Sequence, residues 1–149
     1  MYRLNRILDA NINRAAEGIR VVEDICRFYF ENISLTESMR NMRHTLRKTL
    51  AQFDNDYINA RDSEHDIGRE VSASSNLDNK TSIRQLVNAN FKRAEEAFRV
   101  LEETLKIKDL YNESKVIESL RYELYTVEKS IKKLIKKEIP QGLYCITDL

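Results

Sequence analysis

The sequence predicts an all-α fold of four long helices, arranged as two repeated helical hairpins with a long functional loop between them. A length of 149 residues corresponds to one domain with a single hydrophobic core. Apolar residues recur at steps of three and four along much of the chain, which is the period of amphipathic helices. A motif near the start of the chain returns in its second half, which indicates that one helical unit occurs twice.

The first hairpin is predicted between residues 4 and 53. Its first helix runs from Leu4 to Phe30, where the apolar positions form one continuous stripe. The segment Asn32–Glu37 carries cap-type residues and predicts the start of the second helix. The apolar positions of the two helices are Leu4, Leu8, Ile12, Ala15, Ile19, Val22 and Cys26, then Met39, Met42, Leu46, Leu50 and Phe53.

The second hairpin is predicted from two further helices, over residues 83–106 and 113–138. Pro140 and Gly142 are expected to end the last helix. Between the hairpins, residues 54–82 lose the helical period and gather Asp, Asn and Ser. Long connections inside small domains are usually functional or disordered, so we expect this loop to be functional.

The internal repeat relates residues 8–24 to residues 87–103, which share eight identical residues in seventeen aligned positions. Random pairing would give roughly one identity. The second helices of the two hairpins match more weakly, with Arg43 aligned to Arg121. Two hairpins related by a pseudo-twofold axis would explain these matches.

The composition excludes several classes of function. With 25 Lys and Arg against 24 Asp and Glu, the formal charge is +1, which argues against a nucleic-acid binder. The three glycines are too far apart to form a glycine-rich phosphate loop. Cys26 and Cys145 are expected to be free thiols. The sequence has neither a long apolar run nor a signal-peptide core, so we expect a cytoplasmic protein that binds no membrane.

Four polar residues at equivalent places of the repeat predict a binding pocket. Asn11 lies at the edge of the apolar face, where a carboxamide needs a hydrogen-bond partner. Arginine suits phosphate through its planar fork of donors. We expect Asn11, Arg14, Asn90 and Arg93 to line one pocket, with each arginine serving a different ligand. A structural hydrogen bond between helices is the alternative for the asparagines.

A stripe of polar and charged residues accompanies these positions in each repeat. On a helical wheel this stripe lies well away from the apolar face. The structural alternative to a binding role is a solvated face with ion pairs between residues four apart. The stripe consists of Asp9, Asn13, Glu17, Arg20 and Asp24 in the first repeat, and of Asn88, Lys92, Glu96, Arg99 and Glu103 in the second.

The connecting loop holds another set of candidate residues. Arg61, Asp62 and Asp66 offer one guanidinium and two carboxylates, and the nearby Gly68 can adopt positive φ. This set suits a phosphate together with hydrated Mg²⁺, whose ligands are one or two carboxylates plus phosphate oxygens. A surface Asx turn is the alternative.

Together these segments resemble a known family, the helical domain that precedes thiamine phosphate synthase in fused bacterial proteins. The resemblance covers residues 3 to about 138, and residues 143–148 resemble the first strand of the synthase barrel. We therefore expect a helical domain over 1–139, then a linker and truncated strand over 140–149. The resemblance rests on Asp9–Arg14, Glu17–Asp24, Arg43, His44, Ala60–Asp62, Asp66–Gly68, Asn90–Arg93, Arg121, Tyr122 and Tyr125.

That helical domain is similar to kinases that phosphorylate hydroxymethylpyrimidine phosphate to its diphosphate. The resemblance implies an ATP-dependent phosphotransferase of thiamine biosynthesis that uses ATP and Mg²⁺. Phosphoryl transfer needs mainly positioning and positive charge. From the residue types we expect catalytic roles for Glu17, Arg61 and Asp62, metal ligation by Asp62 and Asp66, and substrate or phosphate binding by Asn11, Arg14, Arg20, Arg43, His44, Gly68, Asn90, Lys92, Arg93 and Arg121.

Two other functions fit the same sequence. One is a non-catalytic helical domain that binds a thiamine precursor, or that docks on the synthase and forms a homodimer. The other is a different all-α enzyme with an arginine-rich pocket, such as a chorismate-mutase-like lyase or isomerase. The aspartates and glycine of the connecting loop favour the kinase, because neither alternative needs carboxylates suited to a metal.

Overall fold

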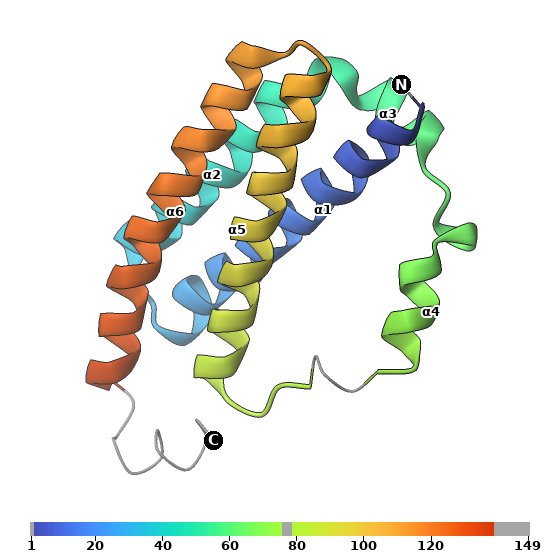
Figure 1. Cartoon of the computed structure of the whole chain (residues 1–149). Coiled ribbons are helices and arrows are strands. Elements are labelled where there is room, and N and C mark those ends of the chain that lie inside the picture. Colours follow the sequence, from blue (N-terminus) through green and yellow to red (C-terminus); the bar gives the residue numbers. More distant parts are fainter. Residues whose placement is uncertain (1, 76–78, 139–149) are drawn as a thin grey trace.

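The computed structural model describes residues 2–75 and 79–138, which form helices, turns and short connections without any strand (Figure 1). The all-α prediction is confirmed. The expected linker and strand over 140–149, with Pro140, Gly142 and Cys145, lie outside the described residues. The long helices are α1 (Tyr2–Asp24), α2 (Ile33–Leu50), α5 (Ile83–Ile107) and α6 (Tyr111–Glu138).

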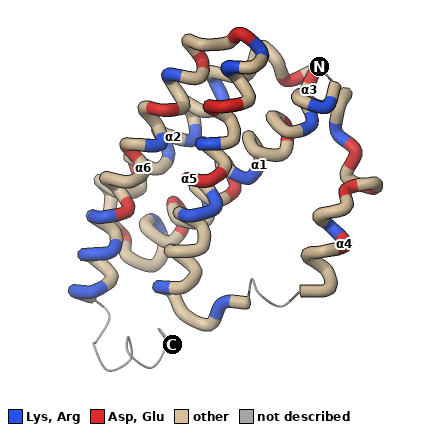
Figure 2. The backbone as a smooth tube through the Cα atoms, viewed as in Figure 1, with Lys and Arg blue, Asp and Glu red and all other residues tan. Residues whose placement is uncertain are grey.

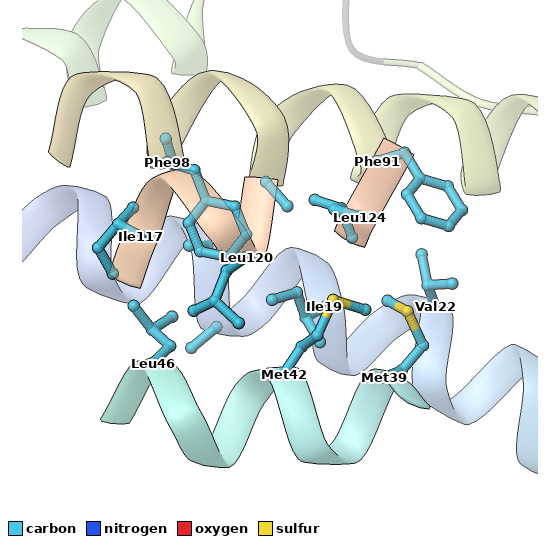
Figure 3. Packing of buried hydrophobic residues seen from close by; sticks show 14 of the residues in the cluster. Ile19, Val22, Met39, Met42, Leu46, Phe91, Phe98, Ile117, Leu120 and Leu124 are labelled. Carbon is cyan, nitrogen blue, oxygen red and sulfur yellow. The ribbon is translucent and has the colours of Figure 1, made fainter. Parts of the chain in front are cut away.

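The four long helices share one apolar core. α1 packs along α5, α2 packs on α1, and α6 packs on both α5 and α2. Figure 3 shows Ile19 of α1, Met42 of α2, Phe98 of α5 and Ile117 of α6 directed into the same core. These positions belong to the stripes with a step of three and four, so the periodicity that predicts the helices also predicts which faces they bury.

The first predicted helix ends earlier than expected. α1 stops at Asp24, and a π-helical turn over Ile25–Tyr29 leads to Glu31, which has a φ of 51°. The side chain of Asn32 then accepts a hydrogen bond from the Leu35 N–H at 2.9 Å and caps α2. The cap-type residues therefore mark the start of the second helix correctly.

The connecting segment is more regular than the loop that the sequence predicts. It contains α3 (Asp54–Ala60) and α4 (Ile67–Ala73), preceded by 3₁₀ turns over Ala51–Phe53 and Ser63–His65. Two turns of helix are too short to show an amphipathic period, which explains why the pattern does not reveal them. α3 packs on α1 and buries Tyr57, whereas every residue of α4 is exposed.

The helices α1 and α5 approach each other closely at Gly18. A Cβ atom on Gly18 would lie 2.9 Å from the Asn90 carbonyl oxygen and 3.5 Å from the Ala94 Cβ. The absence of a side chain therefore permits the contact on which the core and the clefts described below depend. Within the described residues, no helix combines the length and apolar character that a membrane span requires.

Candidate functional site

Two neighbouring clefts lie where α1 meets α5 and the connecting segment. The larger cleft, of about 960 Å³, is lined by α1, α4, α5 and the residues before α5. The smaller cleft, of about 660 Å³, lies between residues 3–17 of α1 and residues 61–66 and is also lined by one residue of α5. Five residues line both clefts, and we call this shared wall the junction: Ala10, Asn11, Arg14, Asp66 and Arg93.

The junction contains the two arginines that the repeat singles out. Arg14 and Arg93 are exposed, and neither has a carboxylate within ion-pair distance among the described residues. Other arginines of the same helices, such as Arg20 and Arg99, are engaged in ion pairs. Two guanidiniums that line the same clefts without an acidic partner among the described residues form a favourable site for a phosphate. Because both line both clefts, the expected assignment of one ligand to each arginine has no support from the geometry.

The two asparagines keep equivalent hydrogen bonds in the two repeats. The Asn11 amide group donates to the Ile7 carbonyl, and that of Asn90 donates to the Leu86 carbonyl, both at 2.8 Å. These bonds lie within one helix, so the predicted alternative of a bond between helices is wrong. Both residues line the larger cleft, as expected for the pocket.

Arg61 is held by a carboxylate that the helical wheel places on a solvated stripe. Its Nε and Nη2 donate to the two oxygens of Asp9, each at 2.7 Å, and this bidentate hydrogen bonding raises the pKa of Arg61. Asp9 is only 7% exposed, and the helix that carries it packs against α3. Arg6 donates to the Asp62 carbonyl at 3.4 Å and ties the same segment to α1. Arg61 therefore lines the smaller cleft with its charge already balanced.

The two predicted magnesium ligands act as helix caps. The Asp62 carboxylate accepts from the His65 N–H at 3.2 Å and lies 2.8 Å from His65 Nδ1, and the side-chain bond lowers the pKa of Asp62. Asp66 Oδ1 accepts from the Gly68 N–H at 2.9 Å, whereas Oδ2 has no partner among the described residues. Gly68 does not adopt positive φ, because it lies in the first turn of α4.

The donor set of the clefts suits one kind of metal site. No group of three or more His, Cys, Asp or Glu side chains in the described part of the chain is arranged to enclose a metal ion. Mg²⁺ needs only one or two carboxylates when phosphate oxygens and water complete its shell. Asp66 lies at the junction with a free oxygen, so Asp66 fits this requirement better than Asp62.

Five predicted binding residues line neither cleft, and four of them are held by acids. Arg43 donates to buried Glu23, and Arg121 donates to fully buried Glu102. Their guanidiniums are therefore committed to charges inside the bundle. The five residues are Arg20 beside Asp24, Lys92 beside Glu95, Arg43, Arg121, and His44, which is exposed on α2.

Lys92 is an exposed residue that pairs with two buried acids between α5 and α6. Glu95 and Glu128 are 4% and 6% exposed, and Lys92 Nζ lies 3.1 Å from Glu95 Oε1 and 3.5 Å from Glu128 Oε2. Burial, followed by a hydrogen bond with Glu128, raises the pKa of Glu95 to about 7. For Glu128, burial alone would raise the pKa, but hydrogen bonds with Glu95 and Lys132 outweigh it, and the pKa is lowered. The pair therefore holds a proton near neutral pH.

Replacing Glu95 with glutamine is expected to stabilise the protein above pH 7. Glu95 binds a proton in the folded state up to about pH 7, but only up to about pH 4.5 when unfolded. The free energy of unfolding of the native protein should therefore fall as pH rises through this range. Glu95→Gln should remove that slope and add about 1 to 3 kcal/mol at pH 8, measured by urea denaturation. The exposed Glu123→Gln is the control, and an unchanged slope in Glu95→Gln would contradict the assignment.

Several cleft residues escape the sequence analysis. Glu96 and Asn88 line the larger cleft, and both belong to the stripe that the wheel assigns to solvent. Their repeat equivalents, Glu17 and Asp9, line the smaller cleft, so the repeat itself is the signal that finds them. Arg69 of α4 also lines the larger cleft, but nothing in its local sequence marks it.

Comparison with known proteins relates the chain to one family. The model of the ThiD2 family matches residues 6–130. The chain is 39% identical over 145 residues to a thiamine-phosphate synthase of Synechocystis sp., which covers 95% of this chain and 40% of that protein. A protein of the same name from Thermosynechococcus vestitus is 38% identical over 87% of this chain and 35% of the relative. Another, from Nostoc punctiforme, is 39% identical over 85% of this chain and 34% of the relative. The chain thus spans about two fifths or less of these relatives. No solved structure matches it significantly.

Proposed function

Because this chain belongs to the ThiD2 family, we propose that it is a phosphotransferase of thiamine biosynthesis that transfers a phosphoryl group from ATP to hydroxymethylpyrimidine phosphate. The junction carries the proposal. Arg14 and Arg93 line both clefts and have no acidic partner in the part of the chain that the structure describes, an arrangement suited to two phosphorylated ligands that meet end to end. The diphosphate product would then be a substrate for a thiamine-phosphate synthase, the activity that the relatives' names state.

The chemistry requires positive charge more than it requires a base. An oxygen of the acceptor phosphate forms a bond to the γ-phosphorus, and the bond from that phosphorus to the β-bridging oxygen breaks, releasing ADP. A phosphate monoester has a second pKa of about 6, so the attacking oxygen is already ionised at neutral pH. Glu17 lines the smaller cleft, but the acceptor phosphate carries no proton there for a base to remove. The role of Glu17 would therefore be to orient the substrate. The main barrier is repulsion between anions, which Arg14 and Arg93 would lower.

Asp66 is the residue that would hold Mg²⁺ beside these arginines. Bound Mg²⁺ would neutralise charge on the phosphates. Asp66 can serve both as the cap of α4, through Oδ1, and as a ligand, through Oδ2. Arg61 would support the smaller cleft by keeping the connecting segment against α1 through Asp9.

Asp66→Asn is expected to lower turnover at least tenfold and to leave the midpoint of thermal unfolding unchanged within a few degrees. Asparagine still caps a helix, so the change removes the charge but keeps the structural role. Asp62→Asn is the matched comparison and should have the smaller effect, since His65 already occupies its carboxylate. Raising the Mg²⁺ concentration should partly restore Asp66→Asn. Full activity of Asp66→Asn would remove this residue from the metal site.

The experiment that tests the function is a coupled ADP-release assay with hydroxymethylpyrimidine phosphate, ATP and Mg²⁺. We expect ADP release that depends on the pyrimidine phosphate, with the diphosphate identified by mass spectrometry. Tight binding of the pyrimidine phosphate without any ADP release would instead favour the non-catalytic ligand-binding domain. Absence of both binding and release would refute the proposal.

A further inference from the structure

Asn88 on α5 carries a buried hydrogen-bond acceptor that no described residue satisfies. Its Oδ1 is shielded from solvent and has no partner, although Asn88 lines the larger cleft. A buried carbonyl oxygen without a donor is unfavourable by about 1 to 3 kcal/mol. Among the described residues that have such an oxygen, Asn88 is the one that lines either cleft. The function of Asn88 is therefore to be sought in what the cleft binds.

The internal repeat shows what kind of group such a position receives. The equivalent of Asn88 is Asp9 on α1, whose two oxygens accept two parallel N–H bonds from the Arg61 guanidinium. In the first repeat, the partner of this position is thus the planar guanidinium of Arg61, in which nitrogen atoms surround one carbon. In the second repeat an amide replaces the carboxylate, and no arginine of the described residues donates to its oxygen.

An amide selects a different partner from that of a carboxylate. Its oxygen accepts one hydrogen bond and its NH₂ group donates one, so it matches an edge with an amino group beside a ring nitrogen. Asparagine reads the amino edge of adenine in this bidentate way. The surrounding wall suits a flat ring, because Leu86, Ala89, Ala97 and Val100 also line the larger cleft.

We propose that Asn88 recognises the amino edge of a nitrogen heterocycle bound in the larger cleft, with the phosphate of the same ligand at Arg14 and Arg93. The inference rests on the proposed function for the presence of such a ligand. Both an aminopyrimidine phosphate and an adenine nucleotide carry this edge, and binding assays can tell them apart.

The test measures dissociation constants by isothermal titration calorimetry with four probes on the full chain. One pair is hydroxymethylpyrimidine phosphate and its analogue without the amino group, and the other is ATP and purine riboside triphosphate, which also lacks the amino group. In the wild type, the amino form of one pair should bind about tenfold tighter than its deamino form. Asn88→Leu should abolish that preference, whereas Asn41→Leu, at an exposed position of α2, should keep it.

The result decides both the residue and the ligand. Loss of the preference in the pyrimidine pair places the acceptor ring in the larger cleft, and loss in the purine pair places the nucleotide there. If Asn88→Leu does not fold, Asn88→Asp replaces it in the test. This variant keeps the shape of the side chain, but its carboxylate cannot donate a hydrogen bond to the ring nitrogen. If both variants keep the wild-type preference for the amino form and still release ADP, the inference about Asn88 is overturned and the proposed function is not. A wild type that neither binds the probes nor releases ADP would overturn the proposed function with it.

Discussion

Replacing Arg14 or Arg93 with alanine is expected to lower kcat about a hundredfold or more while the fold stays intact. Both side chains are exposed, and no described carboxylate depends on them, so removing either leaves no buried charge behind. A preorganised charged donor that faces the reacting group typically contributes a factor of about 100 to 1,000 to the rate. ADP release measured under saturating and limiting concentrations of each substrate separates kcat from KM.

The two arginines should have similar effects, because both line both clefts. Arg47→Ala is the control, since Arg47 is exposed on α2, lines neither cleft and has no acidic partner among the described residues. An increase in KM for one substrate in Arg14→Ala and for the other in Arg93→Ala would restore the division of labour that the repeat suggests. Normal kinetics in both variants would remove the junction from the active site.

The second large effect concerns stability, and it involves an arginine that the sequence places among the binding residues. Arg121→Ala is expected to lower the free energy of unfolding by about 3 to 5 kcal/mol, because it leaves the fully buried Glu102 carboxylate without its bidentate partner. The hydrogen bond with Glu102 also raises the pKa of Arg121, so the guanidinium keeps its positive charge beside this carboxylate. Urea denaturation at pH 7 measures the loss.

A double variant separates the buried charge from the lost packing. Replacing Glu102 and Arg121 together with leucine removes both charges and should recover most of the stability, since apolar residues can replace a buried ion pair with little loss. Arg43→Ala repeats the experiment in the first hairpin, where Glu23 is 3% exposed. If Arg121→Ala loses less than about 1 kcal/mol, water reaches Glu102 and the pair is not structural.

The sequence predicts the helices well because their stripes are long. Ile19, Met42 and Phe98 each belong to an apolar stripe that continues for several helical turns, so the helical period is unambiguous. The two turns of α4 contain Ile67 and Val71 four residues apart, and both are exposed. A pattern of two apolar residues predicts neither a helix nor a buried face, and capping by Asp66 is visible only once the backbone is known.

The site is predicted in part for a similar reason. Asn11 and Arg14 recur as Asn90 and Arg93, and this repetition of polar residues identifies the cleft wall without three-dimensional information. Arg43 and Arg121 are also equivalent residues of the two repeats, but each pairs with a buried acid, Arg43 with Glu23 and Arg121 with Glu102.

Repetition therefore finds residues that matter without distinguishing binding from structure. That distinction depends on which side chains lie within hydrogen-bond distance in the folded protein. Asp9 is a further example: the sequence predicts that it faces solvent, but in the structure it binds Arg61, which lies 52 residues away in the sequence.

The loose attachment of α4 has a consequence for amide hydrogen exchange. All of its residues are exposed, and Figure 1 shows it set apart from the four long helices. The backbone amides of α4 should therefore exchange with deuterium far sooner than those of α1, through local opening that leaves the core closed. Gly68, Arg69 and Ser72 nevertheless line the larger cleft.

A bound ligand would slow exchange in these residues, while the basic last turns of α6 (Figure 2), distant in sequence from the clefts, would exchange as before. Exchange in α4 would thus report cleft occupancy without catalytic turnover.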